Sequence, residues 1–286
     1  MRAAIGGERT VRIWHQSMTV LGDLPAYAAA LRTRIDTVTR PDTEVVLHGF
    51  APGTFNANYP GPDIATSYLY WLHGNQWIAA GLEAERQGFD AMVLASLPGP
   101  MLREIRTLVD IPVVGYGDTA FRLAGLYGRR FGLVFFNTER EEFWPDYIRA
   151  MGLSDSFAGI RAAGVSFQEV AAALGDPGLR AEVIARVKQT VERMVRELNV
   201  DVLVPGEMPL NLLLASEGVS SIGGATVIDG LALTFKTAEM MVDLKRGSGM
   251  MQSRRGWFHG APDRARVAEA LEFYGLDKLG AKIPGE

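Results

Sequence analysis

Two similar stretches of the sequence indicate the type of fold: residues 88–96, Gly-Phe-Asp-Ala-Met-Val-Leu-Ala-Ser, and residues 199–207, Asn-Val-Asp-Val-Leu-Val-Pro-Gly-Glu. In each stretch an aspartate opens a short apolar run, and a polar residue stands six positions after that aspartate. A short apolar run of this kind is typical of a parallel strand that is covered on both faces. We therefore predict two matching buried strands, which lead to Ser96 and to Glu207.

The repetition extends beyond these two strands. Residues 111–115 follow the first stretch after a helical segment, and residues 225–230 follow the second. Residues 11–17 and 131–138 form a further matching pair, so the chain consists of two similar halves. The expected strands are Val11–Trp14, Glu44–His48, Ala91–Ala95, Val113–Gly115, Gly132–Phe136, Ala162–Val165, Val202–Val204 and Thr226–Ile228.

Segments with helical spacing of apolar residues fill the intervals between the strands. Alternating strands and helices predict parallel sheets with right-handed crossovers. The predicted fold class is α/β, with two pseudo-symmetric doubly wound domains and a cleft between them. We expect the first domain to comprise residues 1–118 with 232–286, and the second 119–231. The expected helices are Leu24–Arg40, Tyr68–Gln87, Pro100–Val109, Thr119–Tyr127, Glu141–Met151, Arg180–Leu198, Leu210–Glu217 and Leu231–Lys245.

Composition narrows the classes of function. The 286 residues carry a net charge of −4 and no cluster of basic residues larger than an adjacent pair, which argues against nucleic acid as the partner. No apolar stretch is long enough for a membrane span, and residues 1–12 lack the apolar core of a signal peptide. We expect a cytoplasmic homo-oligomer that acts on a small molecule. The absence of cysteine excludes disulfides and thiolate chemistry.

Polar residues stand at the predicted carboxyl ends of strands in both halves. Ligands of doubly wound sheets bind beyond these ends, so two facing sheets would close a cleft around such residues. Ser96 and Glu207 are the candidate catalytic residues. The candidates for substrate binding are Ser17, Gln16, Leu97, Asn137, Thr138, Met208 and Tyr116.

Four segments together carry a resemblance to a known family: residues 90–100, 111–120, 130–136 and 201–207. In their order and spacing they resemble the aspartate/glutamate/hydantoin racemase superfamily, particularly its hydantoin racemase-like branch. The resemblance covers roughly residues 11–245. It implies two cysteines that face each other across the α-carbon of the substrate, one removing a proton while the other donates one.

This sequence departs from that pattern at both catalytic positions, which are Ser96 and Glu207. A thiol with a pKa of ~8.5 can serve as acid or base near neutral pH, whereas a serine hydroxyl needs an adjacent base. A glutamate is a competent base, and a partly apolar cleft would raise its pKa toward neutrality. With a single base in place of two thiols, we expect one-sided proton transfer, as in isomerisation, decarboxylation, elimination or ring opening. A decarboxylase branch of the superfamily keeps one of the two cysteines. No metal or organic cofactor is implied.

Several alternatives remain open from the sequence. Glu207 could cap the helix that follows it, and Ser96 could be a turn residue. Residues 115–120, Gly-Tyr-Gly-Asp-Thr-Ala, fit a dinucleotide-binding fingerprint, although Asp118 would face a pyrophosphate. A silent carboxylate-binding protein would also account for the missing cysteines. Residues 51–62 could form a lid, residues 250–258 could pack on the first domain or on another subunit, and His15 could orient Ser17 from a deeper layer.

Overall fold

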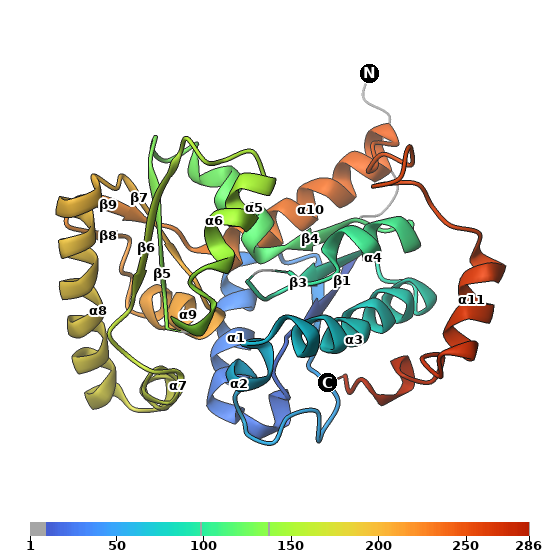
Figure 1. Ribbon diagram of the computed structural model, residues 1–286, viewed down its shortest axis with the longest axis horizontal. Helices are drawn as coiled ribbons and strands as arrows, with labels where there is room; N and C mark the ends of the chain where they lie inside the picture. Colours follow the sequence, from blue (N-terminus) through green and yellow to red (C-terminus); the bar gives the residue numbers. More distant parts are fainter. Residues whose placement is uncertain (1–9, 98, 137, 286) are drawn as a thin grey trace.

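The computed structural model describes residues 10–97, 99–136 and 138–285, and it shows two α/β halves side by side (Figure 1). A four-stranded sheet has the order β2-β1-β3-β4, and a five-stranded sheet has the order β6-β5-β7-β9-β8. The first four strands of the second order occupy the same positions as the strands of the first: β6 corresponds to β2, β5 to β1, β7 to β3 and β9 to β4. The predicted α/β class with two pseudo-symmetric, doubly wound units is therefore confirmed.

The first sheet is parallel throughout. The register pairs Gln16 with both His48 and Leu94, so three neighbouring strands end at one edge. Its strands are β1 (Val11–Gln16), β2 (Thr43–His48), β3 (Ala91–Leu94) and β4 (Val113–Gly115).

The second sheet is parallel except for its last edge strand. Its strands are β5 (Phe131–Phe135), β6 (Phe157–Ala162), β7 (Val202–Pro205), β8 (Ser221–Ile222) and β9 (Ala225–Val227). β8 runs antiparallel to β9 and has no counterpart in the described part of the first half. This strand could not be predicted from the sequence, because two residues between turns carry no periodicity.

One predicted strand is displaced. Residues 162–165 were expected to form a strand, but β6 ends at Ala162. Gly164 has a φ of +74°, which interrupts an extended conformation. Ser166 then starts the next helix with a capping box, in which its hydroxyl accepts from the Glu169 N–H while its own N–H donates to the Glu169 carboxylate. The apolar residues that suggested a strand are buried beneath this turn instead.

The two aspartates that open the repeated strands have the same structural role. The Asp90 carboxylate accepts the backbone N–H of Arg12 at 2.9 Å, at the start of β1. The Asp201 carboxylate accepts the backbone N–H groups of Arg129 and Arg130, just before β5. In each half, the aspartate thus ties the third strand to the start of the first.

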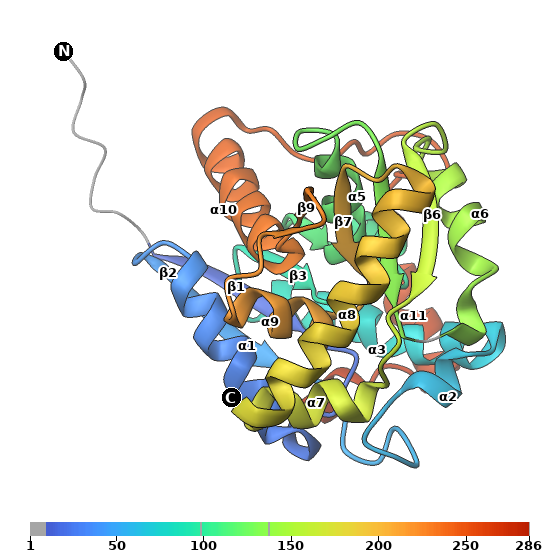
Figure 2. The same ribbon diagram turned by 90° about the vertical axis from the view of Figure 1, so that its left-hand side faces the viewer.

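Helices cover both faces of each sheet, and α8 lies on the outer face of the second half (Figure 2). All eight predicted helices are present, with ends shifted by a few residues. The helices α2, α7 and α11 were not predicted. The helices are α1 (Pro25–Val38), α2 (Gly61–Ile64), α3 (Ser67–Arg86), α4 (Leu102–Leu108), α5 (Tyr116–Ala124), α6 (Phe143–Ala150), α7 (Phe167–Gly175), α8 (Pro177–Leu198), α9 (Met208–Ser216), α10 (Gly230–Ser248) and α11 (Arg264–Phe273), with 3-10 turns η1 (Leu21–Asp23), η2 (Thr138–Arg140) and η3 (Gly280–Lys282). No helix in the described parts of the chain has the length and apolarity needed to span a bilayer.

The halves share buried contacts. α10 follows the second sheet in sequence and packs on α5, β3 and β4 of the first half. The Arg34 guanidinium contacts the Asp229 carboxylate at 2.5 Å across the junction. One cluster of buried apolar residues runs continuously through both halves. The assignment of residues 232–286 to the first domain and the domain boundaries at 118 and 231 stay predictions.

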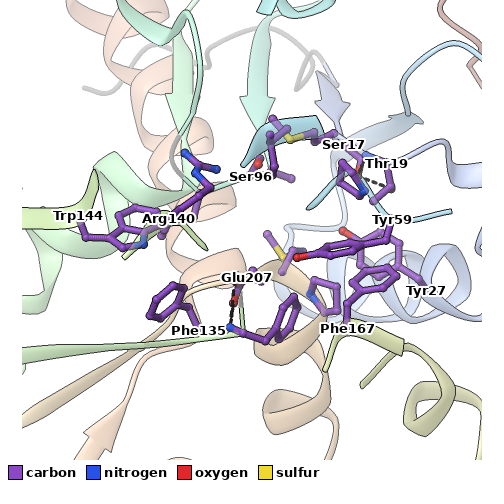
Figure 3. A pocket seen from close by; sticks show the side chains of 18 residues that line it. Ser17, Thr19, Tyr27, Tyr59, Ser96, Phe135, Arg140, Trp144, Phe167 and Glu207 are labelled. Carbon is purple, nitrogen blue, oxygen red and sulfur yellow. Dashed lines mark hydrogen bonds between the residues drawn. The ribbon is translucent and has the colours of Figure 1, made fainter. Parts of the chain in front are cut away.

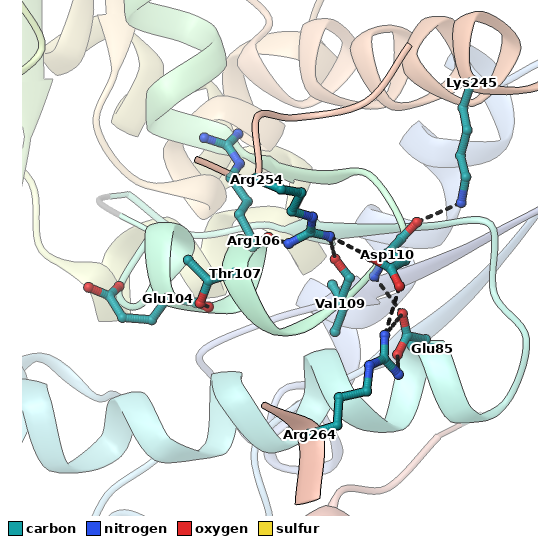
Figure 4. Close-up of polar contacts among 9 residues, drawn as sticks. All are labelled: Glu85, Glu104, Arg106, Thr107, Val109, Asp110, Lys245, Arg254 and Arg264. Atoms are coloured by element: carbon teal, nitrogen blue, oxygen red, sulfur yellow. Dashed lines mark hydrogen bonds and ion pairs between the residues drawn. The ribbon is translucent and has the colours of Figure 1, made fainter. Parts of the chain in front are cut away.

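Two arginines of the segment after α10 form hydrogen bonds and ion pairs with the first half (Figure 4). Arg254 donates to the backbone carbonyls of Arg106 and Val109 and to the Asp110 carboxylate. Arg264, at the start of α11, pairs with Glu85 and Asp110. Of the two interpretations of residues 250–258, packing on the first domain is the one that the structure shows.

Candidate active site

A cavity lies between the halves, where strands of both sheets end (Figure 3). Ser17 follows β1, Ser96 follows β3, Phe136 follows β5 and Glu207 follows β7, and all four line the cavity. Ser96 and Glu207, which are far apart in the sequence, therefore meet at one site. The other lining residues are Met18, Thr19, Tyr27, Tyr59, Pro60, Ile64, Ala95, Leu97, Phe135, Arg140, Trp144, Phe167, Met208 and Pro209.

Glu207 stands between β7 and α9, in the position that caps the helix. Its side chain nevertheless makes no capping hydrogen bond. The two carboxylate oxygens instead accept the backbone N–H of Phe136 at 3.2 and 3.3 Å. The capping interpretation is therefore wrong: the carboxylate turns toward the end of β5, and Pro209 in the first turn of α9 has no N–H to be capped.

Close approach of two strands places this carboxylate. The Gly206 N–H donates to the Val134 carbonyl at 2.6 Å. A Cβ atom on Gly206 would lie 2.7 Å from the Cβ of Phe135 and 2.8 Å from the Val134 carbonyl oxygen. Only glycine allows this contact, so the Gly206 backbone holds Glu207 beside the end of β5.

Several hydroxyl groups lie on the cavity wall that the first half of the molecule forms. The Ser17 and Thr19 hydroxyls lie 2.8 Å apart in a hydrogen bond, and the Thr19 N–H donates to Ser17 at 3.3 Å. Tyr27 is buried next to them, and burial raises the pKa of its hydroxyl well above the usual range, opposed by a hydrogen bond with Ser17. All three hydroxyls are therefore neutral. The hydrogen bonds that link them use two of their three hydrogens, which leaves one hydrogen to donate to a substrate oxygen.

The other sequence candidates divide into two groups. Leu97 and Met208 line the cavity with Ser17, as expected. Gln16 and Tyr116 do not: the Gln16 amide accepts from Trp14 Nε1 and donates to the Ser17 carbonyl, because strand alternation turns it away from the Ser17 face. Tyr116 is fully buried behind the site, where its hydroxyl donates to the Pro205 carbonyl at 2.7 Å.

Two further candidates lie after β5. Thr138 starts the 3-10 turn η2, is exposed and is not among the lining residues, because the chain turns outward there. Asn137 lies outside the described residues. Of these two candidates, the structure therefore describes only Thr138, and it places Thr138 outside the cavity lining.

His15 lies one layer below Ser17, as strand alternation predicts. Its ring is fully buried and stacks on Phe235, and neither ring nitrogen has a hydrogen-bond partner among the described residues. Burial lowers the pKa of His15 to about 3, so the ring is neutral. His15 therefore does not orient Ser17 through a hydrogen bond.

The glycines of the dinucleotide fingerprint have a packing role. A Cβ on Gly115 would lie 2.8 Å from the Leu102 side chain, and one on Gly117 would lie 3.2 Å from Leu97. Asp118 pairs with arginines on both sides, Arg106 and Arg122. Close packing of α5 thus accounts for the motif without a phosphate ligand.

Aromatic residues and one arginine complete the site, and they were not among the candidates from the sequence. Tyr59, in the loop proposed as a lid, stacks on Phe167 of the other half at 4.3 Å between ring centroids. Arg140 and Trp144 line the opposite side of the cavity. Phe143 and Trp144, which follow Arg140 closely in the sequence, could have pointed to Arg140, because a guanidinium near aromatic residues can stack on their rings.

Comparison with known proteins identifies the family of the chain. Residues 34–238, well over half of the chain, match the profile of the Asp/Glu/Hydantoin racemase family. The chain belongs to this family. It is 24% identical over 200 residues to the hydantoin racemase of Pseudomonas sp. (strain NS671), a match that covers 70% of this chain and 75% of the relative.

Two solved structures of racemases share the fold of this chain. Allantoin racemase from Klebsiella pneumoniae superposes with a TM-score of 0.68 at 22% identity, over 89% of this chain and 94% of the other. Allantoin racemase from Pseudomonas fluorescens gives a TM-score of 0.66 at 22% identity, over 88% and 97% of the two chains. The resemblance inferred from the four sequence segments is therefore confirmed at the level of family and fold.

Proposed function

We propose that this family member is an enzyme that transfers a proton on one side of the α-carbon of a small carboxylate or cyclic amide, as an isomerase or a lyase. The observation that carries the proposal is that Glu207 and Ser96 line one cavity from different halves (Figure 3). Glutamate can take and return a proton, whereas a serine without an adjacent base cannot. Only the Glu207 side therefore carries protons.

The surrounding groups suit an enolate intermediate. When a proton leaves the α-carbon, negative charge develops on the neighbouring carbonyl oxygen. Neutral hydroxyls such as those of Ser17 and Ser96 can donate to that oxygen, and donors already in place act at low cost in reorganisation. The related hydantoin and allantoin racemases are named for cyclic ureides, which supports a substrate with an acidic carbon next to a carbonyl.

Deuterium exchange separates one-sided from two-sided chemistry. Single enantiomers of hydantoins and of α-substituted acids are incubated with the protein in D2O, followed by NMR and chiral chromatography. Glu207 acting alone should exchange the α-proton with retention of configuration. Exchange accompanied by inversion at the same rate, or ligand binding without any exchange, would contradict the proposal.

Substitution assigns the proton carrier. Glu207→Gln keeps the size of the side chain and should lower exchange at least ~10²-fold. Glu217→Gln is the matched control, because Glu217 is an exposed residue at the other end of α9 that pairs with Arg180. Exchange at the wild-type rate in the Glu207 variant would remove Glu207 from the mechanism.

A further inference from the structure

Arg140 is a buried cation on the wall of the cavity. Only 7% of its surface is exposed, although arginine is among the residues that proteins bury least. Its guanidinium carbon lies 4.5 Å from the ring centroid of Tyr70, 4.9 Å from that of Phe143 and 5.7 Å from that of Trp144. Aromatic rings thus hold the side chain in place and stabilise its charge in part.

This cation has no anionic partner within the described part of the chain. None of the ion pairs between residues of that part includes Arg140, and Asp118 is paired with Arg106 and Arg122 instead. The Tyr70 ring lies against Arg140, but burial raises the pKa of Tyr70 to about 12, so its hydroxyl stays neutral and supplies no negative charge. Burial of an uncompensated charge is costly unless a ligand supplies the counter-charge.

The guanidinium is placed where a substrate can reach it. In Figure 3 it lies on the Ser96 side of the cavity, while Glu207 projects from the facing side. The guanidinium fork can bind both oxygens of a carboxylate at once. The stacked rings of Tyr59 and Phe167 form an apolar surface elsewhere in the same cavity.

We propose that Arg140 binds a carboxylate of the substrate, so that this site selects anionic ligands with an apolar group over neutral cyclic amides. This inference rests on the proposed function for the location of the site, and it narrows the substrate class to carboxylates. A carboxylate held by Arg140 near Ser96 would present the adjoining carbon to Glu207. Arg140 is then a residue that determines specificity, and Glu207 remains the proton carrier.

Benzoate and benzamide test the inference, since they have the same shape and differ in charge. Binding is followed by intrinsic tryptophan fluorescence, and Trp144 is the one of the five tryptophans that is among the lining residues. The wild-type protein should bind benzoate on the order of 10- to 100-fold more tightly than benzamide, as expected for a charge-assisted hydrogen bond. Equal affinities for the two ligands would overturn the proposal without any variant.

Variants locate the effect. Arg140→Met should bind both ligands equally, and Arg140→Lys should keep part of the preference, because it keeps the charge but not the fork. Arg149→Gln is the control, an exposed arginine on α6. A preference for benzoate that persists in a folded Arg140→Met protein would refute the role of Arg140.

The outcomes for the two proposals can be told apart. If benzoate binding depends on Arg140 but no substrate exchanges deuterium, the carboxylate site stands and the proton-transfer function fails. If exchange occurs and depends on Glu207 while Arg140→Met leaves the preference unchanged, the function stands and this inference fails. Glu207→Gln should bind benzoate at least as well as the wild type, which separates binding from chemistry.

Discussion

Replacement of Gly206 by alanine tests how the Glu207 carboxylate is positioned. The new Cβ atom would lie 2.7 Å from the Phe135 Cβ and 2.8 Å from the Val134 carbonyl oxygen, and both atoms belong to a central strand. To reach a van der Waals contact of about 3.5 Å, β5 and β7 must separate by roughly 0.8 Å. The 2.6 Å hydrogen bond from Gly206 to Val134 and the contacts of Glu207 with the Phe136 N–H would then lengthen.

The expected cost has two parts. Overpacking of a buried site lowers the free energy of unfolding by about 1–3 kcal/mol. Displacement of a catalytic group by up to 1 Å lowers turnover by up to about 10²-fold. Urea unfolding measures the first effect, and α-proton exchange measures the second.

Gly247→Ala is the matched control for this substitution. Gly247 lies in α10, and a Cβ atom added there would meet no other atom within 4 Å, so alanine should be neutral or stabilise the protein by about 0.5–1 kcal/mol. If Gly206→Ala were as stable and as active as Gly247→Ala, the argument that close strand contact places Glu207 would be refuted.

Three further predictions concern the surroundings of the site. Tyr116→Phe leaves the buried Pro205 carbonyl without its 2.7 Å donor and should cost about 1–3 kcal/mol of unfolding free energy in urea, whereas no loss would show that this hydrogen bond is dispensable. His15 has a folded-state pKa of about 3, below its unfolded value of 6.5, so its contribution to stability is complete above pH 6.5 and falls by up to about 1.4 kcal/mol per pH unit as the pH drops toward 3. Urea unfolding of His15→Leu should therefore show a shallower loss of stability over this pH range than the wild type. His48, whose pKa burial lowers to about 4, contributes to the remaining decline. Arg254→Gln should release residues 250–258 to faster hydrogen exchange without changing benzoate affinity, and unchanged exchange would mean that its contacts with Arg106, Val109 and Asp110 do not hold the segment.

Much of the candidate site could be predicted because it depends on strand ends. Ser17, Ser96 and Glu207 each follow a short buried strand, and parallel strands of a doubly wound sheet expose their carboxyl ends at one edge. The alternation of side chains along β1 also separates Ser17 from Gln16, which points away from the cavity. The capping role of Glu207 could not be decided from the sequence, because a glutamate before Met208-Pro209 is compatible with both positions of its side chain.

The duplicated α/β architecture could be predicted from the sequence, since each half repeats the same apolar strands and the same opening aspartate, and these local patterns dictate burial. The composition likewise requires that any chemistry here proceed without thiols. Which side chains share the cavity depends on tertiary packing. Arg140, Tyr59 and Phe167 come from turns and from a helix start in different halves, and their meeting depends on how two sheets pack, which no local periodicity records.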